Sequence, residues 1–582
     1  MDVIKKILKS VREYKAASIL APLFVIGEVF METVIPLLMA KMIDDGFSAG
    51  DMHYIVKTGG VMLVCAIAGL FFGVMSGRYA AIASAGLAKN LRQDMYNHIQ
   101  DFSFRNIDHF STASLVTRLT TDITNVQNAY QMIIRMLVRA PVMMVFSFVM
   151  AMIINVKLSM IILLAIPILG AFIVIISVQA HGIFRKLFII YDRMNTVVQE
   201  NLLGIRTVKA YVREQREIDK FTETSSESKR LSIEAEKRLI LNMPFMSLLT
   251  AACTVLISLL GANMIIKGTG SLTTGGLMSL FTYIIQILSS LMMVSMIVIQ
   301  CVMAKASADR IVEVMDEKSD LADNDHPVME VPDGSIEFDH VSFGYFPGKD
   351  KYVLNDINFS IKPGEVVGII GGTGSSKSTL VSLIPRLYDA AEGSVKVGGV
   401  DVRNYDIKTL RDQVSMVLQK NELFSGTIKE NLKWGNENAT DEQILEACKI
   451  SQADEFVQTM PDKYDTHIEQ GGRNVSGGQK QRLCIARALL KQPKILILDD
   501  STSAVDMATD ALIQEGMKNY LPQTTKIVIA QRIASVEHAD KIIVLDQGRI
   551  SGIGTNEELL KNNEIYREVA QSQRKGGEGD EQ

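Results

Sequence analysis

The sequence predicts an α-helical transmembrane bundle of six spans followed by a mixed α/β domain. Long apolar runs dominate the chain up to about Ala304, whereas from Ser335 onward short apolar strands alternate with charged, helix-like stretches. The segment 316–334 between them is acidic and contains two prolines, which is typical of a linker. With 582 residues, the chain is long enough for several domains. We therefore expect a membrane domain at 1–315, a linker at 316–334, an α/β domain at 335–575 and a disordered tail at 576–582.

Six segments come close to the roughly 20 apolar residues that a membrane-spanning helix needs. They are 17–40, 60–81, 138–154, 158–180, 244–266 and 277–303. Two of the intervening segments, 82–137 and 181–243, are long and charged, with a helical composition. The alternative is that the apolar runs are buried helices of a large soluble core.

The distribution of basic residues argues against that alternative and predicts the orientation. Within residues 1–315, most of them lie in the N-terminal arm and in 182–243, whereas the opposite-side loops hold only Lys41, Lys57, Lys157 and Lys267. Because basic loops stay on the cytoplasmic side, we expect both termini, both long segments and the α/β domain to be cytoplasmic. The chain is then a multi-pass protein of the plasma (cell inner) membrane.

Two carboxylates, Glu28 and Glu32, lie one helical turn apart inside the first span. Because a charge costs several kcal/mol in lipid, both should face a wet cavity, a partner group or another helix. One interpretation is a polar patch in a substrate pathway that favours cationic cargo. The other is an interhelical hydrogen bond near the membrane edge.

Composition excludes several other classes of protein. The formal net charge is −5, so no basic field points to nucleic acid. The five cysteines form no CxxC pair, so neither a disulfide framework nor a zinc site is indicated.

A phosphate-binding loop is predicted in the α/β domain. The apolar strand 365–370 leads into a Gly-rich loop, and a helix-like stretch follows at 380–388. The loop consists of Gly371, Gly372, Thr373, Gly374, Ser375, Ser376, Lys377, Ser378 and Thr379. Its backbone N–H groups would cradle phosphate, Lys377 would reach the β- and γ-phosphates, and Ser378 would bind Mg²⁺.

A second strand, 495–499, places Asp499 at its carboxyl end, where doubly wound sheets bind ligands. Asp499 therefore suits a second Mg²⁺ ligand. These two motifs alone allow any P-loop nucleotide enzyme.

The stretch Val475-Ser476-Gly477-Gly478-Gln479 narrows the class, because here the chain resembles the ATP-binding cassette (ABC) superfamily. The resemblance extends to the six spans, as in an ABC half-exporter. It implies that Tyr345 stacks on adenine, that Gln419 senses Mg²⁺, and that Asp506 ends the loop 503–506 between the two sites.

In this family, two cassettes enclose two ATP molecules, and each site combines the phosphate loop of one chain with the signature, here Ser476–Gln479, of the other. The segments 117–125 and 201–211 resemble the family's coupling segments.

Three positions depart from the family pattern. Asp500 replaces the Glu that activates water, and because Asp is one methylene shorter, its carboxylate lies about an ångström short, which can cost about a hundredfold in rate. Gln531 replaces a His that contacts the γ-phosphate in the family. Unlike His, Gln cannot carry a positive charge. Ser376 replaces a glycine, which costs about 1–3 kcal/mol if the position requires a positive φ.

The combination of Asp500 and Gln531 resembles the degenerate-site subunit of heterodimeric bacterial multidrug exporters. It implies ATP-driven export of amphipathic drugs, lipids or peptides by alternating access, with ATP and Mg²⁺ as cofactors. The partner would be a second half-exporter with Glu and His at these positions. Two alternatives stay open: a slow homodimeric exporter and a non-hydrolysing, ATP-gated membrane sensor.

Overall fold

The computed structural model describes residues 2–268, 272–345, 352–501 and 505–577. The chain forms two compact units. The first comprises Met1–Gln100 and Thr112–Glu317, and the second comprises Asp101–Ser111 and Lys318–Gln582. The short insertion 101–111 therefore belongs to the unit that contains the α/β domain.

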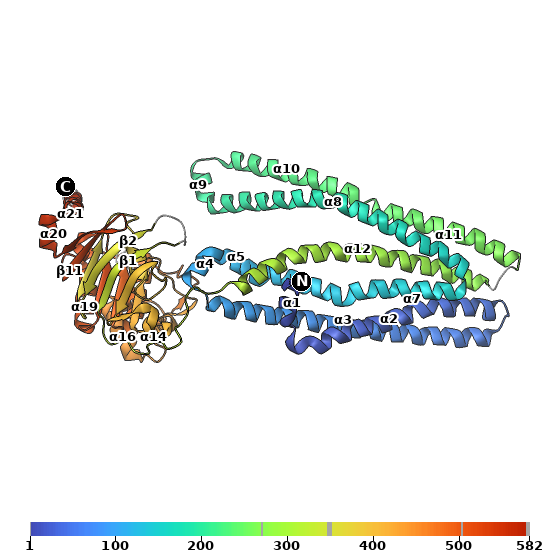
Figure 1. Ribbon diagram of the computed structural model, residues 1–582, viewed down its shortest axis with the longest axis horizontal. Helices are drawn as coiled ribbons and strands as arrows, with labels where there is room; N and C mark the ends of the chain where they lie inside the picture. Colours follow the sequence, from blue (N-terminus) through green and yellow to red (C-terminus); the bar gives the residue numbers. More distant parts are fainter. Residues whose placement is uncertain (1, 269–271, 346–351, 502–504, 578–582) are drawn as a thin grey trace. The chain divides into compact units, whose positions relative to one another are not determined.

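The first unit is entirely helical over its described residues (Figure 1). Its main helices are α1 (Asp2–Lys9), α2 (Lys15–Lys41), α3 (Met52–Gln100), α5 (Thr112–Thr117), α6 (Ile123–Met132), α7 (Val138–Ile154), α8 (Val156–Leu203), α9 (Ile205–Ala210), α10 (Glu214–Leu239), α11 (Asn242–Ile266) and α12 (Thr274–Asp316). Over the described residues, six helical segments are long and apolar enough to cross a membrane. Each contains all or most of one predicted span, so the six-span prediction is confirmed.

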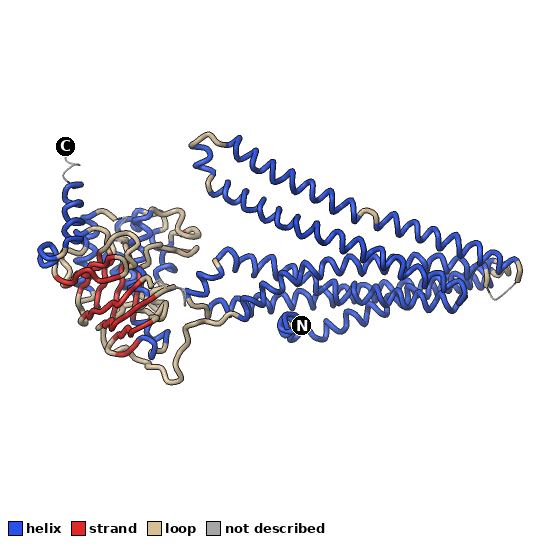
Figure 2. Tube along the Cα trace, turned by 45° about the horizontal axis from the view of Figure 1, so that its top comes forward, coloured by secondary structure: helices blue, strands red, loops and turns tan. Residues whose placement is uncertain are grey.

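The long charged segments between the spans are continuations of the membrane helices. Helix α3 extends to Gln100, and α8 extends to Leu203 before α10 returns beside it (Figures 1 and 2). Leu187 and Ile190 of α8 pack with Leu231 of α10, and Lys220 pairs with Glu200 at 2.8 Å. The helical composition that the sequence indicated for 82–137 and 181–243 is thus confirmed.

Small residues bring the first membrane helices close together. Ala21 of α2 and Ala80 and Ala83 of α3 are fully buried in one cluster. Because lipid supplies no hydrophobic drive between helices, close backbone approach through small side chains is what stabilises such a bundle. Large apolar side chains instead lie on the outer surface of α3, for example Val64 and Ile67.

The second unit is built on two main sheets. The four-stranded antiparallel sheet has the order β2 (Leu354–Ile361), β1 (Ile336–Phe343), β4 (Glu392–Val397), β5 (Val400–Asp401). The six-stranded sheet has the order β12 (Arg549–Gly554), β11 (Lys541–Asp546), β3 (Val366–Ile370), β10 (Thr525–Ile529), β9 (Ile495–Asp499), β6 (Val414–Val417). Its strands are parallel except for β12 at the edge. The near-continuous apolar runs of β3, β9 and β10 are buried, as a parallel sheet covered on both faces requires.

Helices and a short two-stranded ribbon complete this unit. They are α13 (Lys377–Ser382), α14 (Ile407–Gln413), β7 (Gly426–Thr427), α15 (Ile428–Leu432), α16 (Asp441–Ile450), α17 (Asp454–Thr459), β8 (His467–Ile468), α18 (Gly477–Leu490), α19 (Met507–Tyr520), α20 (Asn556–Asn562) and α21 (Glu564–Gly577).

The strand register places three functional segments at one sheet edge. Ile529 of β10 pairs with Ile369 of β3 and with Asp499 of β9. Because these strands are parallel, the loops that follow them leave from the same edge, which is where ligands bind in such sheets. The phosphate loop follows β3, Asp500 follows β9, and Gln531 comes shortly after β10.

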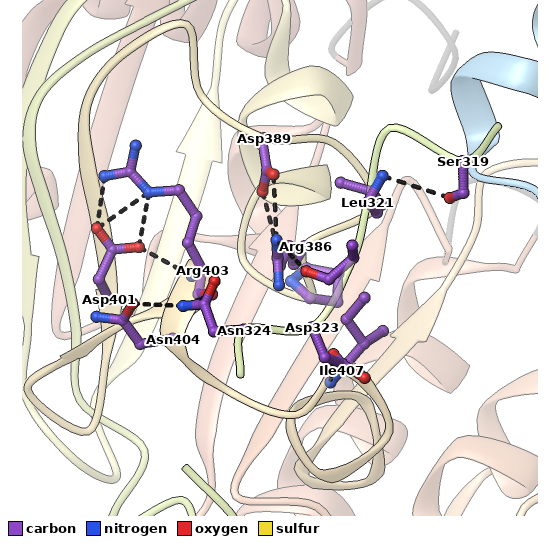
Figure 3. Close-up of polar contacts among 12 residues, drawn as sticks. Ser319, Leu321, Asp323, Asn324, Arg386, Asp389, Asp401, Arg403, Asn404 and Ile407 are labelled. Atoms are coloured by element: carbon purple, nitrogen blue, oxygen red, sulfur yellow. Dashed lines mark hydrogen bonds and ion pairs between the residues drawn. The ribbon is translucent and has the colours of Figure 1, made fainter. Parts of the chain in front are cut away.

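The predicted linker is attached to the second unit along its length (Figure 3). Asn324 donates to the Arg403 carbonyl oxygen at 3.0 Å, and Asp323 accepts from the Ile407 backbone N–H at 3.0 Å. Arg386 pairs with Asp389 and donates to the Ala322 carbonyl oxygen at 3.1 Å. Helix α12 ends at Asp316, and the boundary between the units falls between Glu317 and Lys318.

Helix α4 (Phe104–Phe110) of the insertion packs against the α/β domain within the second unit. The Phe104 and Tyr388 rings meet edge to face at 6.0 Å, and the Tyr388 hydroxyl donates to Asp108 at 2.8 Å. Burial, together with this bond to Asp108, raises the pKa of Tyr388.

The segment 117–125, which resembles a coupling segment of the family, packs against α12. That segment lies in the first unit, where Arg118 donates to the Arg310 carbonyl oxygen at 2.7 Å and Arg310 pairs with Asp122. Both contacts are to α12. The other expected coupling segment, 201–211, spans the end of α8 and α9 in the first unit.

Candidate functional site

The phosphate loop wraps around the amine of Lys377. Its Nζ donates to the carbonyl oxygens of Gly371 at 2.9 Å and Gly372 at 3.0 Å. Burial lowers the pKa of Lys377, and the nearby charges of Asp499 and Asp500 oppose that shift. A cation is thus held at the centre of a loop of backbone donors, which is an arrangement that binds phosphate.

The predicted residues of the phosphate site converge on one cavity of about 240 Å³. Its lining consists of Gly371, Thr373, Gly374, Ser375, Ser376, Lys377, Ser378, Thr379, Gln419, Asp499, Asp500, Ile529 and Gln531. Residues from four separate stretches of the sequence therefore meet where β3, β9 and β10 end.

Backbone geometry limits which residues the loop can hold. A Cβ at Gly371 would lie 2.1 Å from the Leu545 carbonyl oxygen, so only glycine fits there. Ser376 has φ +71°, in the left-handed region, and its side chain makes no capping bond to α13. The condition for the predicted strain at Ser376 is therefore met, at a cost of about 1–3 kcal/mol.

Ser378 and Asp499 form an oxygen pair suited to Mg²⁺. The Ser378 hydroxyl donates to Asp499 Oδ1 at 3.0 Å, and Asp499 is 4% exposed. Burial raises the pKa of Asp499, and the bond from Ser378 partly offsets that effect. Over the described residues, no three His, Cys, Asp or Glu side chains gather as a metal site. The remaining ligands would thus come from nucleotide oxygens and water, as is usual for Mg²⁺.

Asp500 receives bonds from two side-chain amides. Gln531 Nε2 donates to Asp500 Oδ2 at 2.8 Å, and Gln419 Nε2 donates to the same oxygen at 3.4 Å. The Gln481 amide donates to the Asp500 backbone oxygen at 3.2 Å, and Asp500 has φ +48°. Gln419, predicted as a Mg²⁺ sensor, thus bonds to Asp500, and its contact with Mg²⁺ stays a prediction.

Tyr345 lies beside the helix that follows the phosphate loop. Its hydroxyl is 2.8 Å from Thr379 Oγ1, and its ring meets Phe343 and Tyr388 edge to face at 5.1 and 5.3 Å. These contacts fix the ring at the border of the phosphate site. Stacking on adenine stays a prediction.

The signature segment begins helix α18 and faces solvent. Ser476 is its N-cap: the Ser476 hydroxyl accepts from Gln479 N at 3.2 Å, and Gln479 Oε1 accepts from Ser476 N at 2.9 Å. Ser476 and Gly477 are exposed, and Ser476, Gly477, Gly478 and Gln479 do not line the phosphate cavity. Within one chain, the signature and the phosphate loop are therefore separate surfaces.

Asp506 has a comparable role at the start of α19. It is the N-cap and accepts from the Thr509 backbone N–H at 2.9 Å. That bond is the main cause of the lowered pKa of Asp506. Ser503 and Ala504 of the same predicted loop lie outside the described residues.

One residue near the site was missed by sequence reasoning. Gln573 of α21 donates to the Gln531 carbonyl oxygen at 2.7 Å and accepts from the Ile533 backbone N–H at 2.9 Å. It lines a second cavity of about 630 Å³ that also includes Asp500 and Gln531. Nothing in its local sequence distinguishes Gln573 from an ordinary exposed helical glutamine.

The two carboxylates of the first span share one partner. Arg139 of α7 pairs with Glu28 through Nη1 and with Glu32 through Nη2, both at 2.5 Å. This is an interhelical contact, and both carboxylates also line a cavity of about 620 Å³, so the two interpretations of these residues stay open. Contact with a substrate stays a prediction.

Comparisons with known proteins agree with both halves of this description. Residues 18–292 match the ABC transporter transmembrane region, and residues 354–503 match the ABC transporter domain. The ABC transporter ATP-binding protein YfiB of Bacillus subtilis is 37% identical over 577 residues, which cover 99% of this chain and 100% of that protein. An ABC transporter ATP-binding protein of Mycobacterium tuberculosis is 36% identical over 551 residues, 93% of each chain.

A solved structure shares the fold of the whole chain. The structure of a bacterial Atm1-family ABC exporter with ATP bound superimposes with a TM-score of 0.78 at 24% sequence identity. The match covers 97% of this chain and 98% of that one. The chain therefore belongs to the ABC transporters, as a half-transporter that joins one six-helix transmembrane region to one ATP-binding domain.

Proposed function

We propose that this chain is the ATP-holding subunit of a heterodimeric exporter for amphipathic compounds such as drugs, lipids or peptides. In this arrangement its phosphate loop binds ATP and turns it over slowly, and its signature completes a hydrolysing site on a different half-exporter. The ATP-binding domain and both termini are cytoplasmic, and the complex moves cargo out of the cell membrane by alternating access.

The observation that carries this proposal is the bonding of Asp500. To activate water, a carboxylate oxygen at this position must be within reach of the attacking water and free to accept its proton. Asp500 Oδ2 already accepts amide N–H groups from Gln531 at 2.8 Å and Gln419 at 3.4 Å. Its shorter side chain and these bonds both favour holding ATP over hydrolysing it.

The rest of the site retains what ATP binding requires. The loop amides and Lys377 would hold the phosphates, and Ser378 and Asp499 would hold Mg²⁺. The metal neutralises phosphate charge when bound. Gln531 can donate a hydrogen bond to a γ-phosphate but supplies no positive charge there.

The exposed signature supports a role on a second chain. Ser476 and Gly477 present a hydroxyl and backbone N–H groups at the N-terminus of α18, a 14-residue helix. Such a terminus attracts anions, so it can bind the γ-phosphate of an ATP held by a partner.

An apolar tip on the membrane unit also supports a two-chain assembly. Around α9, Leu203 is 81% exposed, Tyr211 73% and Val212 80%. Adjacent apolar side chains at this exposure are typical of a protein interaction surface. This tip lies in 201–211 and next to it, so we propose that the segment binds the partner's ATP-binding domain.

The test is ATPase activity of the purified chain alone, and in complex with a half-exporter encoded next to it that carries Glu and His at the positions of Asp500 and Gln531. We expect phosphate release about a hundredfold faster from the complex than from this chain alone. Equal turnover without the partner would favour a slow homodimer. No turnover in any complex would favour an ATP-gated sensor.

A second experiment tests which of the two ATP sites hydrolyses ATP. Ser476→Ala in this chain should remove most of the turnover of the complex, because its signature completes the partner's site. Full activity of that variant would contradict the proposed division of labour.

A further inference from the structure

A groove in the membrane unit brings charged side chains against a row of glycines. It has a volume of about 620 Å³ and lies between α2, α3 and α7. Gly69, Gly73 and Gly77 of α3 form one wall at four-residue spacing, and Arg135 lies just before α7. The volume is within the usual range of ligand pockets, about 300–1,000 Å³.

The glycines provide the space that the charged groups occupy. A Cβ at Gly73 would lie 3.1 Å from Glu28 Oε1, and one at Gly77 would lie 3.6 Å from Arg135 Nη1. Because residues four apart share one helix face, the three glycines leave a strip along α3 that has no side chains. The groove therefore admits a slender molecule alongside its charged groups.

The two arginines of the groove differ in their bonding. Arg139 uses both terminal nitrogens on Glu28 and Glu32. The side chain of Arg135, one helical turn earlier, has no hydrogen bond or ion pair with any residue in the described ranges. Glu28 and Glu32 also line the groove, but each already accepts a hydrogen bond from Arg139, and Glu28 Oε2 is buried. Of the four charged side chains that line the groove, Arg135 is the one without a partner among the described residues.

Arg135 lies three residues before the predicted span 138–154, in the helical segment Thr112–Ile154 that is apolar enough to cross a membrane. An unpaired guanidinium at such a position is costly in a membrane protein. Charged groups within membrane helices pair with one another or mark a substrate pathway. Arg presents parallel N–H donors that bind a carboxylate or phosphate in two-point contact, and such charge-assisted bonds are stronger than neutral ones. An anionic group is the ligand that these donors fit best.

We propose that the groove binds an amphipathic molecule through its anionic head, a carboxylate, phosphate or sulfonate, with Arg135 as the contact. The apolar tail would lie along the glycine strip beside Ile35 and Val74, which also line the groove. This inference rests on the proposed transport of amphipathic compounds and specifies their charge. It is opposite to the preference for cationic cargo that Glu28 and Glu32 suggested.

The test uses two fluorescent probes with the same apolar body and opposite charge. Dansyl-labelled undecanoic acid and dansyl-labelled undecylamine are titrated onto the full chain in phosphatidylcholine nanodiscs, with empty discs subtracted. We expect the acid to bind more tightly than the amine, and Arg135→Gln to weaken acid binding about tenfold or more. Arg135→Lys should restore part of the affinity because it keeps the charge.

Arg78→Gln is the matched control. Arg78 is exposed on α3, one residue from Gly77, and also has no partner in the described part of the chain. Its substitution should leave the difference in affinity between the acid probe and the amine probe unchanged. The thermal unfolding midpoint of each variant shows whether it is folded.

Competition identifies the source of the anion. Phosphatidylglycerol added to the discs competes if a lipid head group fills the groove, whereas methyl phosphate in the buffer competes if a free anion suffices. Either pattern, lost in Arg135→Gln, supports the anion site. Equal effects of Arg135→Gln on both probes, or tighter binding of the amine, would overturn it. If ATPase activity depends on the partner but the acid probe binds no more tightly than the amine probe, this inference alone is overturned. The proposed function would then still stand.

Discussion

The side-chain amide of Gln531 donates a hydrogen bond of 2.8 Å to Asp500 Oδ2. The two residues that depart from the ABC pattern therefore contact one another. Their backbones are brought together by parallel pairing of β9 with β10, in which Asp499 lies opposite Ile529. The two substitutions thus act as one unit, in which a neutral amide binds a shortened carboxylate.

Restoring both family residues should produce activity. In Asp500→Glu with Gln531→His, the carboxylate extends by about one ångström and the amide that holds it is removed. We expect the ATPase rate of this chain without its partner to rise about tenfold to a hundredfold, measured as phosphate release at saturating ATP. Each single variant should gain less than the double variant. An unchanged rate in a double variant that still binds MgATP would contradict this explanation.

Ser376→Gly should stabilise the chain. Serine at φ +71° costs about 1–3 kcal/mol, and glycine removes that cost while adding about 0.5–1 kcal/mol of chain entropy to be lost on folding. The net expectation is a gain of about 1 kcal/mol, observed as a higher thermal unfolding midpoint of the ATP-binding domain in the full chain. Ser375→Gly is the control, because Ser375 is not among the residues with positive φ. A lower midpoint for Ser376→Gly than for the unmodified chain would show that the serine is not strained.

Gln573→Ala should loosen the segment around Gln531. The variant loses two hydrogen bonds, to the Gln531 carbonyl oxygen and from the Ile533 N–H, each worth about 1 kcal/mol. We expect faster hydrogen exchange at the backbone amides of residues 531–535, measured by mass spectrometry. Gln571→Ala, at an exposed position on the same helix, should leave exchange there unaltered. Equal exchange in both variants would assign Gln573 no part in holding the segment.

Acid should weaken the contribution of Mg²⁺ to ATP binding. Burial raises the pKa of Asp499 above the ordinary value of 3.8, so its ionised form is lost at a higher pH than for an exposed Asp. A raised carboxyl pKa stabilises the nucleotide-free fold as pH falls, and this stabilisation is lost as pH rises through the folded-state pKa. Metal binding has the opposite dependence because it requires the carboxylate.

The measurement for this prediction is the ratio of ATP dissociation constants with and without Mg²⁺, from about pH 7.5 down to about pH 5. We expect the ratio to approach one on acidification and to be close to one at every pH in Asp499→Asn. A large ratio that stays constant across the range would exclude Asp499 as the titrating ligand.

The architecture was predictable from the sequence because its signals are local. Apolar runs of membrane length and a strand, glycine loop and helix in succession are readable without knowing any long-range contact. The pairing of Asp500 with Gln531 was not, because a bond across 31 positions depends on strand order. Arg139 lies one residue inside the predicted span 138–154, yet its pairing with Glu28 and Glu32 depends on how α7 packs against α2.

The insertion 101–111 shows a different limit. Its helix α4 is only seven residues long, too short for a periodicity signal, so its packing against the α/β domain could not be predicted. What binds α4 to the α/β domain is the pair of contacts from Phe104 and Asp108 to Tyr388, which lies 280 residues after Asp108 in the chain. The role of Gln573 could not be predicted either, because it depends entirely on its tertiary contacts with Gln531 and Ile533.

The fate of ATP at this chain's own phosphate loop tests the central claim most directly. The complex with its partner is loaded with 8-azido-ATP labelled on the γ-phosphate, allowed to turn over, and then photo-crosslinked, and the two chains are separated. We predict that this chain keeps the γ-label over many turnovers while the partner loses it. Loss of the label from both chains at the same rate would contradict a holding site formed by Asp500 and Gln531.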